Sequence, residues 1–240
     1  MADITNGYTD AVHAWRLRRV PVQVYLPIAN RRALMLLLTI DALVIGLHVS
    51  TGVLMPRIPE VLNITTEFGL AECIGYGKWL AIVAVLLLAW NLTGCRVLFP
   101  FAVIFAVMLA DDMLQLHEHI GHRLAARQLV SAMGPLRPHE VGEIVGYAAL
   151  FLPLMPPLLR AWSQSGERGH HLTGSLMGLL MLFGVFGVVI DALHPVFGGT
   201  RIADALLYLV EDGGEILVSS LILAHVLAIW QTAQPAAPRD

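Results

Sequence analysis

The chain is 240 residues long, 57% hydrophobic and only 14% charged, whereas soluble globular domains are about 25% charged. Together with a mean hydropathy of +0.70, this composition excludes an ordinary soluble domain and predicts an all-α integral membrane protein in contact with the lipid bilayer. The formal net charge of −3 and the lack of a basic patch interleaved with aromatic residues give no support to a nucleic-acid partner.

The N-terminal residues 1–32 form a polar lead followed by a short stretch in which apolar side chains alternate with arginines. This pattern predicts an amphipathic segment on the membrane surface, and a solvated basic tail is the alternative. The arginines concerned are Arg16, Arg18, Arg19, Arg31 and Arg32.

Six apolar segments are long enough to cross a bilayer, which takes about 20 residues. They lie at residues 33–55, 76–95, 98–122, 139–160, 171–195 and 205–231. We therefore expect one transmembrane domain at 33–231, a bundle of about six helices, followed by a C-terminal tail at 232–240. Cys73 and Cys95 fall near opposite ends of the second segment, so they are predicted not to pair.

Arginine and lysine residues suggest an orientation, because cytoplasmic loops carry an excess of them. The excess rests mostly on the N-terminal segment, and it predicts that both chain termini are cytoplasmic. Within the fifth segment, Gly174, Gly178, Gly184 and Gly187 are expected to form a small-residue face for helix packing.

The third segment runs without interruption into the polar stretch at residues 110–122. If the helix continues straight, six polar side chains fall within an arc of roughly 120°, and only His117 points elsewhere. The six are Asp111, Asp112, Gln115, Glu118, His119 and His122. Carboxylates and imidazoles on one stripe need a cation or partner groups to compensate them.

Ionisable residues of the other segments fall at the same membrane level when the alternating direction of the spans is taken into account. Close spacing places Glu140 with Glu143, Asp191 with His194, and Glu211 with Glu215 on one helix face each. Inward carboxylates and imidazoles from several helices are how helical bundles build dinuclear metal centres. The predicted metal ligands are Asp112, Glu118, His119, His122, Glu140, Glu143, Asp191, His194, Glu211 and Glu215.

Oxygen and nitrogen donors without thiolates favour iron, with manganese or zinc as alternatives. The sequence thus predicts a carboxylate/histidine metal site near the outer face, of the di-iron type, in an oxidoreductase that acts on a hydrophobic or membrane-soluble substrate. A homo-oligomer or a larger membrane complex is compatible with this prediction.

Three alternatives stay open at this point. A metal-ion or proton-coupled transporter would use the same residues and would need a polar path through the membrane, for which Asp41 and His225 are the candidates. The simpler interpretation of Asp41 and His225 is one buried hydrogen bond between them. A haem protein would need histidines at matched depth, such as His48 with His119 or His194, but the excess of carboxylates argues against haem. The third alternative is an accessory subunit with a structural polar network.

Overall fold

The computed structural model describes residues 31–234, in which helices are joined by turns and loops and the sole β-pairing is an isolated bridge between Met133 and Leu136. The predicted surface segment at 1–32 lies almost entirely outside the described residues, as does most of the tail at 232–240. The helices are α2 (Arg31–Leu54), α3 (Leu70–Thr93), α4 (Leu98–Leu114), α5 (Leu116–Ala126), α6 (Pro138–Phe151), α7 (Met155–Ser163), α8 (Glu167–Gly184), α9 (His194–Phe197) and α10 (Arg201–Ala233).

Several of these helices are long and apolar enough to cross a membrane, as expected from the sequence. Within residues 31–234 five spans qualify, and the bent pair α4–α5 makes a sixth if it is counted as one. The five are Arg31–Leu54, Leu70–Thr93, Pro138–Ser163, Glu167–Phe197 and Arg201–Ala233. The fold is consistent with a multi-pass membrane protein.

Helix α3 begins earlier than the sequence indicated, at Leu70 rather than residue 76. Its first turns pack beside the loop that follows α2, where Ala71 joins Val44 and Ile64 in a small buried cluster. Its end is marked by Gly94, which adopts the left-handed conformation (φ 63°) that commonly stops a helix. The early start brings Glu72, which lies before the predicted span, into the helical bundle.

The third span is not one straight helix, which corrects the expectation of a continuous polar stripe. Gln115 is in the left-handed conformation (φ 49°, ψ 44°), and α5 continues at 62° to α4. Helix α5 also ends at Ala126, well before the connection to α6. The residues on the two sides of Gln115 therefore point in different directions.

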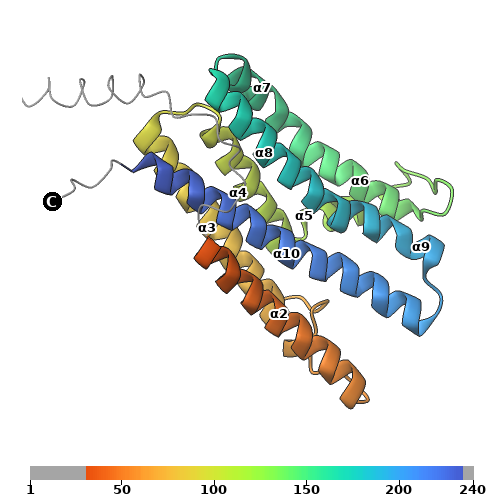
Figure 1. The fold of residues 1–240 in the computed structure, drawn as a ribbon. Helices are drawn as coiled ribbons and strands as arrows, with labels where there is room; N and C mark the ends of the chain where they lie inside the picture. Colours follow the sequence, from red (N-terminus) through yellow and green to blue (C-terminus); the bar gives the residue numbers. More distant parts are fainter. Residues whose placement is uncertain (1–30, 235–240) are drawn as a thin grey trace, which may run out of the picture.

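The two ends of the bundle differ in packing. We call the end where α2 and α4 finish and α3 and α10 begin the acidic end. The main buried cluster fills the middle and the opposite end, with Ile82, Phe101, Phe105 and Ile222 among its fully buried members. Helix α10 contacts α2, α3 and α8 and runs along the length of the bundle (Figure 1).

The glycines that mediate close helix packing are not those expected. A Cβ atom at Gly174, Gly178 or Gly184 would meet nothing within 4 Å, so the predicted packing face of the fifth span is wrong for these three. The close approach occurs instead between α5 and α6, where a Cβ on Gly142 would lie 2.7 Å from the carbonyl oxygen of Gly121. Small residues allow such backbone contact between helices in membranes.

Candidate functional site

The structure brings the ten predicted ligands to the acidic end but distributes them over four places. Asp112 and Glu215 line one pocket, and Glu140, Glu143 and Asp191 line a second. His194 and Glu211 contact each other, with 2.8 Å between Nε2 and Oε2. The remaining three, Glu118, His119 and His122, lie on α5.

Two of the predicted metal ligands, His119 and His122, do not line either pocket. His119 and His122 are exposed, and their Nδ1 atoms lie 2.7 Å and 3.0 Å from carbonyl oxygens of their own helix. Among residues 31–234 no three His, Cys, Asp or Glu side chains are grouped so that they could hold a metal ion. The predicted ligands thus lie at one end of the bundle but do not form one site.

The first pocket, which we call the acidic pocket, lies between α3, α4, α8 and α10 and has a volume of about 60 Å³. Four carboxylates line it, from Glu72, Asp112, Asp212 and Glu215. No basic side chain of the described residues is among its lining. The pocket therefore brings four carboxyl groups together among helices that are long and apolar enough to span a membrane.

Local structure fixes these carboxylates in different ways. Glu72 accepts hydrogen bonds from the Tyr76 hydroxyl (2.9 Å) and from the backbone N–H of Phe68 (2.5 Å). The Oδ2 atom of Asp212 is buried and has no hydrogen-bond partner among the described residues. A buried polar atom without a partner costs stability, so it marks a place where a ligand or water is favoured.

Glu215 is held against the end of the fifth span by an irregular turn. There α8 passes into a π-helical turn, Val185–Ile190, and such turns are frequent at functional sites. A Cβ atom on Gly187 in this turn would collide with the carboxylate of Glu215. A side chain at this position would displace the Glu215 carboxylate, which occupies the space beside Gly187.

A buried ion pair lies directly behind the acidic pocket. Lys78 Nζ is 2.6 Å from Asp41 Oδ1, 2.8 Å from the carbonyl oxygen of Ile216 and 3.4 Å from Ser219 Oγ. Ile216 and Ser219 also line the pocket, so the ammonium group borders its inner wall. The exposed fractions are 4% for Lys78 and 0% for Asp41. The predicted hydrogen bond between Asp41 and His225 is therefore wrong, and His225 contacts Ser175 instead (2.9 Å).

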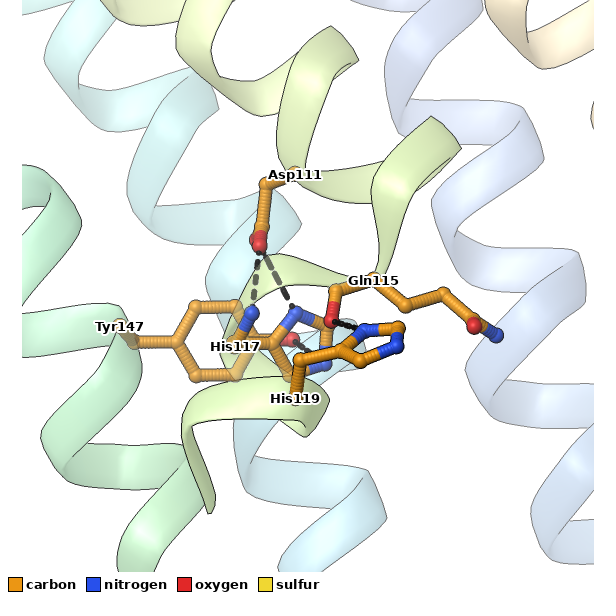
Figure 2. A network of polar contacts seen from close by, with 5 residues as sticks. All are labelled: Asp111, Gln115, His117, His119 and Tyr147. Atoms are coloured by element: carbon orange, nitrogen blue, oxygen red, sulfur yellow. Dashed lines mark hydrogen bonds and ion pairs between the residues drawn. The ribbon is translucent and has the colours of Figure 1, made fainter. Parts of the chain in front are cut away.

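A second polar chain lies at the bend between α4 and α5 (Figure 2). His117 Nδ1 is 3.1 Å from both carboxylate oxygens of Asp111, its Nε2 is 3.0 Å from the Tyr147 hydroxyl, and its backbone N–H donates to Asp111 Oδ1 at 2.9 Å. His117 is the one residue that the straight-helix interpretation had placed away from the polar stripe. The bend at Gln115 makes it the best-connected histidine of the stretch.

Tyr147 connects this chain to the second pocket, which is smaller, at about 20 Å³. Arg137 partly neutralises that pocket, because its Nε lies 2.7 Å from Oε1 of Glu140. The same hydrogen bonds to Glu140 raise the pKa of the Arg137 guanidinium above its ordinary value. The acidic pocket has no such partner in its wall and is the stronger candidate site.

Sequence reasoning missed Glu72, Lys78, His117 and Tyr147 as site residues. Lys78 could have been identified from the sequence, because it lies in a long apolar run and a second apolar run contains the opposite charge of Asp41. Two opposite charges in neighbouring spans are expected to pair because an isolated charge in hydrocarbon is costly. His117 had no such signal, because its position depends on the left-handed conformation of Gln115.

Comparison with known proteins places the chain in a family. Residues 32–230 match the family model described as Domain of unknown function (DUF8692). The chain belongs to this family. The match covers the first five predicted spans, all but the last residue of the sixth, and the whole candidate site. No curated protein and no solved structure matches the chain.

Proposed function

We propose that the protein is a membrane transporter for a hard divalent cation such as Mg²⁺ or Mn²⁺, which binds in the acidic pocket. The observation that carries this proposal is the set of four carboxylates around one pocket, in helices able to cross a membrane. Ionisable residues within transmembrane segments typically mark ion pathways and are rarely left without a partner.

The chemistry of the donors favours a hard cation. The polar side chains of the acidic pocket offer oxygen atoms from Glu72, Asp112, Asp212, Glu215 and Ser219, apart from the indole of Trp79. Carboxylate oxygens and water suit Mg²⁺ and Mn²⁺ better than metals that prefer imidazole or thiolate. Mg²⁺ keeps several waters and is held through one or two carboxylates, so it does not need three converging side chains.

The size of the pocket argues against a large organic substrate. Pockets for drug-sized ligands have volumes of about 300–1,000 Å³, whereas the acidic pocket measures about 60 Å³. An ion with a few waters is the occupant that this volume allows. Redox chemistry at an iron centre on a hydrophobic substrate stays a prediction, because none of the described contacts tests it.

The packing of the bundle supports transport over static binding. Beyond Lys78 the bundle is filled by the main apolar cluster, so the acidic pocket is closed toward the opposite end. A carrier has its site accessible from one side at a time, and the other side opens when parts of the bundle rock against each other. The described state corresponds to access from the acidic end.

We also propose an orientation of the protein in the membrane. With six spans both chain termini lie on one side of the membrane, and the arginine-rich N-terminal residues favour the cytoplasm for that side. Under this orientation the acidic end faces outward, and the cation enters the pocket from outside.

The test is Mn²⁺ binding by the purified protein, measured by electron paramagnetic resonance, and Mn²⁺ uptake into proteoliposomes, measured by quenching of an enclosed dye. We expect D112N/E215Q to weaken binding at least tenfold and to abolish uptake. The matched control is E60Q/E118Q, which also removes two negative charges near the acidic end but lies outside the pocket lining. Wild-type protein without Mn²⁺ uptake, or equal losses in the two double variants, would overturn the proposal.

A further inference from the structure

Lys78 places a fixed positive charge next to a site that is proposed to hold a cation. Its ammonium group is bound to Ile216 and Ser219, two residues whose other sides form the wall of the acidic pocket. Lys78 is 4% exposed, so water screens its charge weakly. A cation in the pocket would therefore be repelled by Lys78 more strongly than by a surface lysine.

Asp41 offsets part of this repulsion. Its Oδ1 lies 2.6 Å from Lys78 Nζ, and its Oδ2 is buried without a hydrogen-bond partner among the described residues. Asp41 is wholly buried, and Val44 is the only other buried residue of α2. The Asp41–Lys78 pair is thus the main polar attachment of α2 to α3 and α10.

We propose that Lys78 is a residue that sets the cation affinity of the acidic pocket, and that Asp41 tunes how much of the Lys78 charge reaches the bound ion. This inference rests on the proposed cation site. A transport site must bind its ion well enough to load and weakly enough to release it. The ammonium group behind the carboxylates of the pocket limits the affinity for a divalent cation, because it repels the bound ion.

The two members of the pair should therefore have opposite effects on binding. Replacing Lys78 by Gln removes the repelling charge, whether or not Asp41 stays ionised. Replacing Asp41 by Asn leaves the positive charge of Lys78 without its compensation. At an effective dielectric constant of about 20, a unit charge within about 8 Å of a divalent ion changes its affinity more than tenfold.

The test is the dissociation constant for Mn²⁺ of the purified full chain, measured by electron paramagnetic resonance for wild type, K78Q, D41N and D41N/K78Q. We expect the constant to fall at least tenfold in K78Q, to rise at least tenfold in D41N, and to return toward wild type in the double variant. H225Q serves as the control, because His225 is equally buried in α10 but contacts Ser175 and does not line the pocket.

The outcomes separate this inference from the proposed function. A wild type that binds no Mn²⁺ contradicts the cation site itself. If the wild type binds Mn²⁺ but K78Q and D41N shift the dissociation constant in the same direction, or do not shift it, the cation site is retained. The proposed role of Lys78 is then overturned. If K78Q does not fold, K78R replaces it. That variant keeps the charge, so its constant is expected to stay close to that of wild type, and a tenfold change would contradict the proposal.

Discussion

Gln115 determines where the histidines of the third span point. Its left-handed conformation (φ 49°) separates α4 from α5, so His117 turns back to Asp111 while His119 remains exposed. A residue with a Cβ atom pays about 1 kcal/mol for this conformation, whereas glycine adopts it freely. The side chain of Gln115 compensates in part through a contact with Glu67.

The strain at Gln115 can be measured with a matched pair of variants. Q115G and Q115A both lose the contact with Glu67. The difference between their free energies of unfolding therefore measures only the cost of the left-handed backbone conformation. We expect Q115G to be more stable than Q115A by about 1 kcal/mol, because only glycine relieves the left-handed conformation. Thermal unfolding in detergent measures this difference. A Q115A protein as stable as Q115G would mean that α4 and α5 are not separated by a left-handed residue.

The Asp111–His117–Tyr147 chain predicts a graded loss of stability. In Y147F the imidazole loses one hydrogen-bond partner, which costs about 1 kcal/mol. H117A should cost more, about 2–3 kcal/mol, since it leaves the buried Asp111 carboxylate without its ring partner. H119A on the exposed face is the control and is expected to change stability by less than about 0.5 kcal/mol. Chemical or thermal unfolding gives the order, and a loss in H119A equal to that in H117A would contradict the contacts of Figure 2.

At the level of elements, α5 and α6 form the most extensive helix–helix contact among the described residues. Gly142 and Gly146 on α6 face Gly121 and the backbone of His117 on α5. This contact positions His117 beside Tyr147 and so supports the polar chain at the bend. The spacing of Gly142 and Gly146, four residues apart, is the small-residue pattern that brings membrane helices together.

Glycine-to-alanine substitutions test this pair against an internal control. A Cβ on Gly142 would lie 2.7 Å and 2.8 Å from atoms of Gly121, so G142A must push the two helices apart. We expect G142A to lose about 1–3 kcal/mol through overpacking. G174A has open space and should be neutral or gain up to about 1 kcal/mol from helix propensity. Thermal unfolding of both variants measures this, and a G142A protein as stable as G174A would exclude the close α5–α6 contact.

The sequence predicted the spans well because each depends on a long apolar run, which is a local property. The start of α3 was predicted late because Gly75 resembles a loop residue, although packing against Val44 and Ile64 keeps that segment helical. The gathering of the ionisable residues at one end of the bundle followed from span direction alone. Their division into separate pockets depends on the bend at Gln115 and on helix rotations, which no local pattern encodes.

At the scale of the whole molecule, the length of α10 relates the acidic end to the membrane. Its 33 residues make a helix about 50 Å long, whereas the hydrocarbon core is about 30 Å thick. The buried residues of α10 begin at Gly213 and continue to Ala233, so the surplus length lies at the N-terminal end. In the proposed transporter we therefore expect Asp212 and Glu215 to lie near the membrane boundary, where a cation from water would reach them at lower cost than at the bilayer centre.

The two free cysteines can be used to determine which end of the bundle faces the outside of the cell. Cys73 is exposed at the acidic end, and Cys95 is half-buried between α3 and α4 at the opposite end. Burial raises the pKa of the Cys95 thiol, so at neutral pH less of it is the reactive thiolate, and its modification should accelerate as pH rises. In detergent, a water-soluble maleimide should therefore modify Cys73 before Cys95.

On intact cells the same reagent distinguishes the two orientations, because a charged maleimide does not cross the membrane. If the acidic end faces outward, C95S should be modified from outside through Cys73, and C73S should be modified only after the cells are opened. Mass spectrometry of the labelled protein gives the result. Labelling of C73S on intact cells, with C95S protected, would reverse the orientation and place the acidic pocket on the cytoplasmic side, where it would load cations for export.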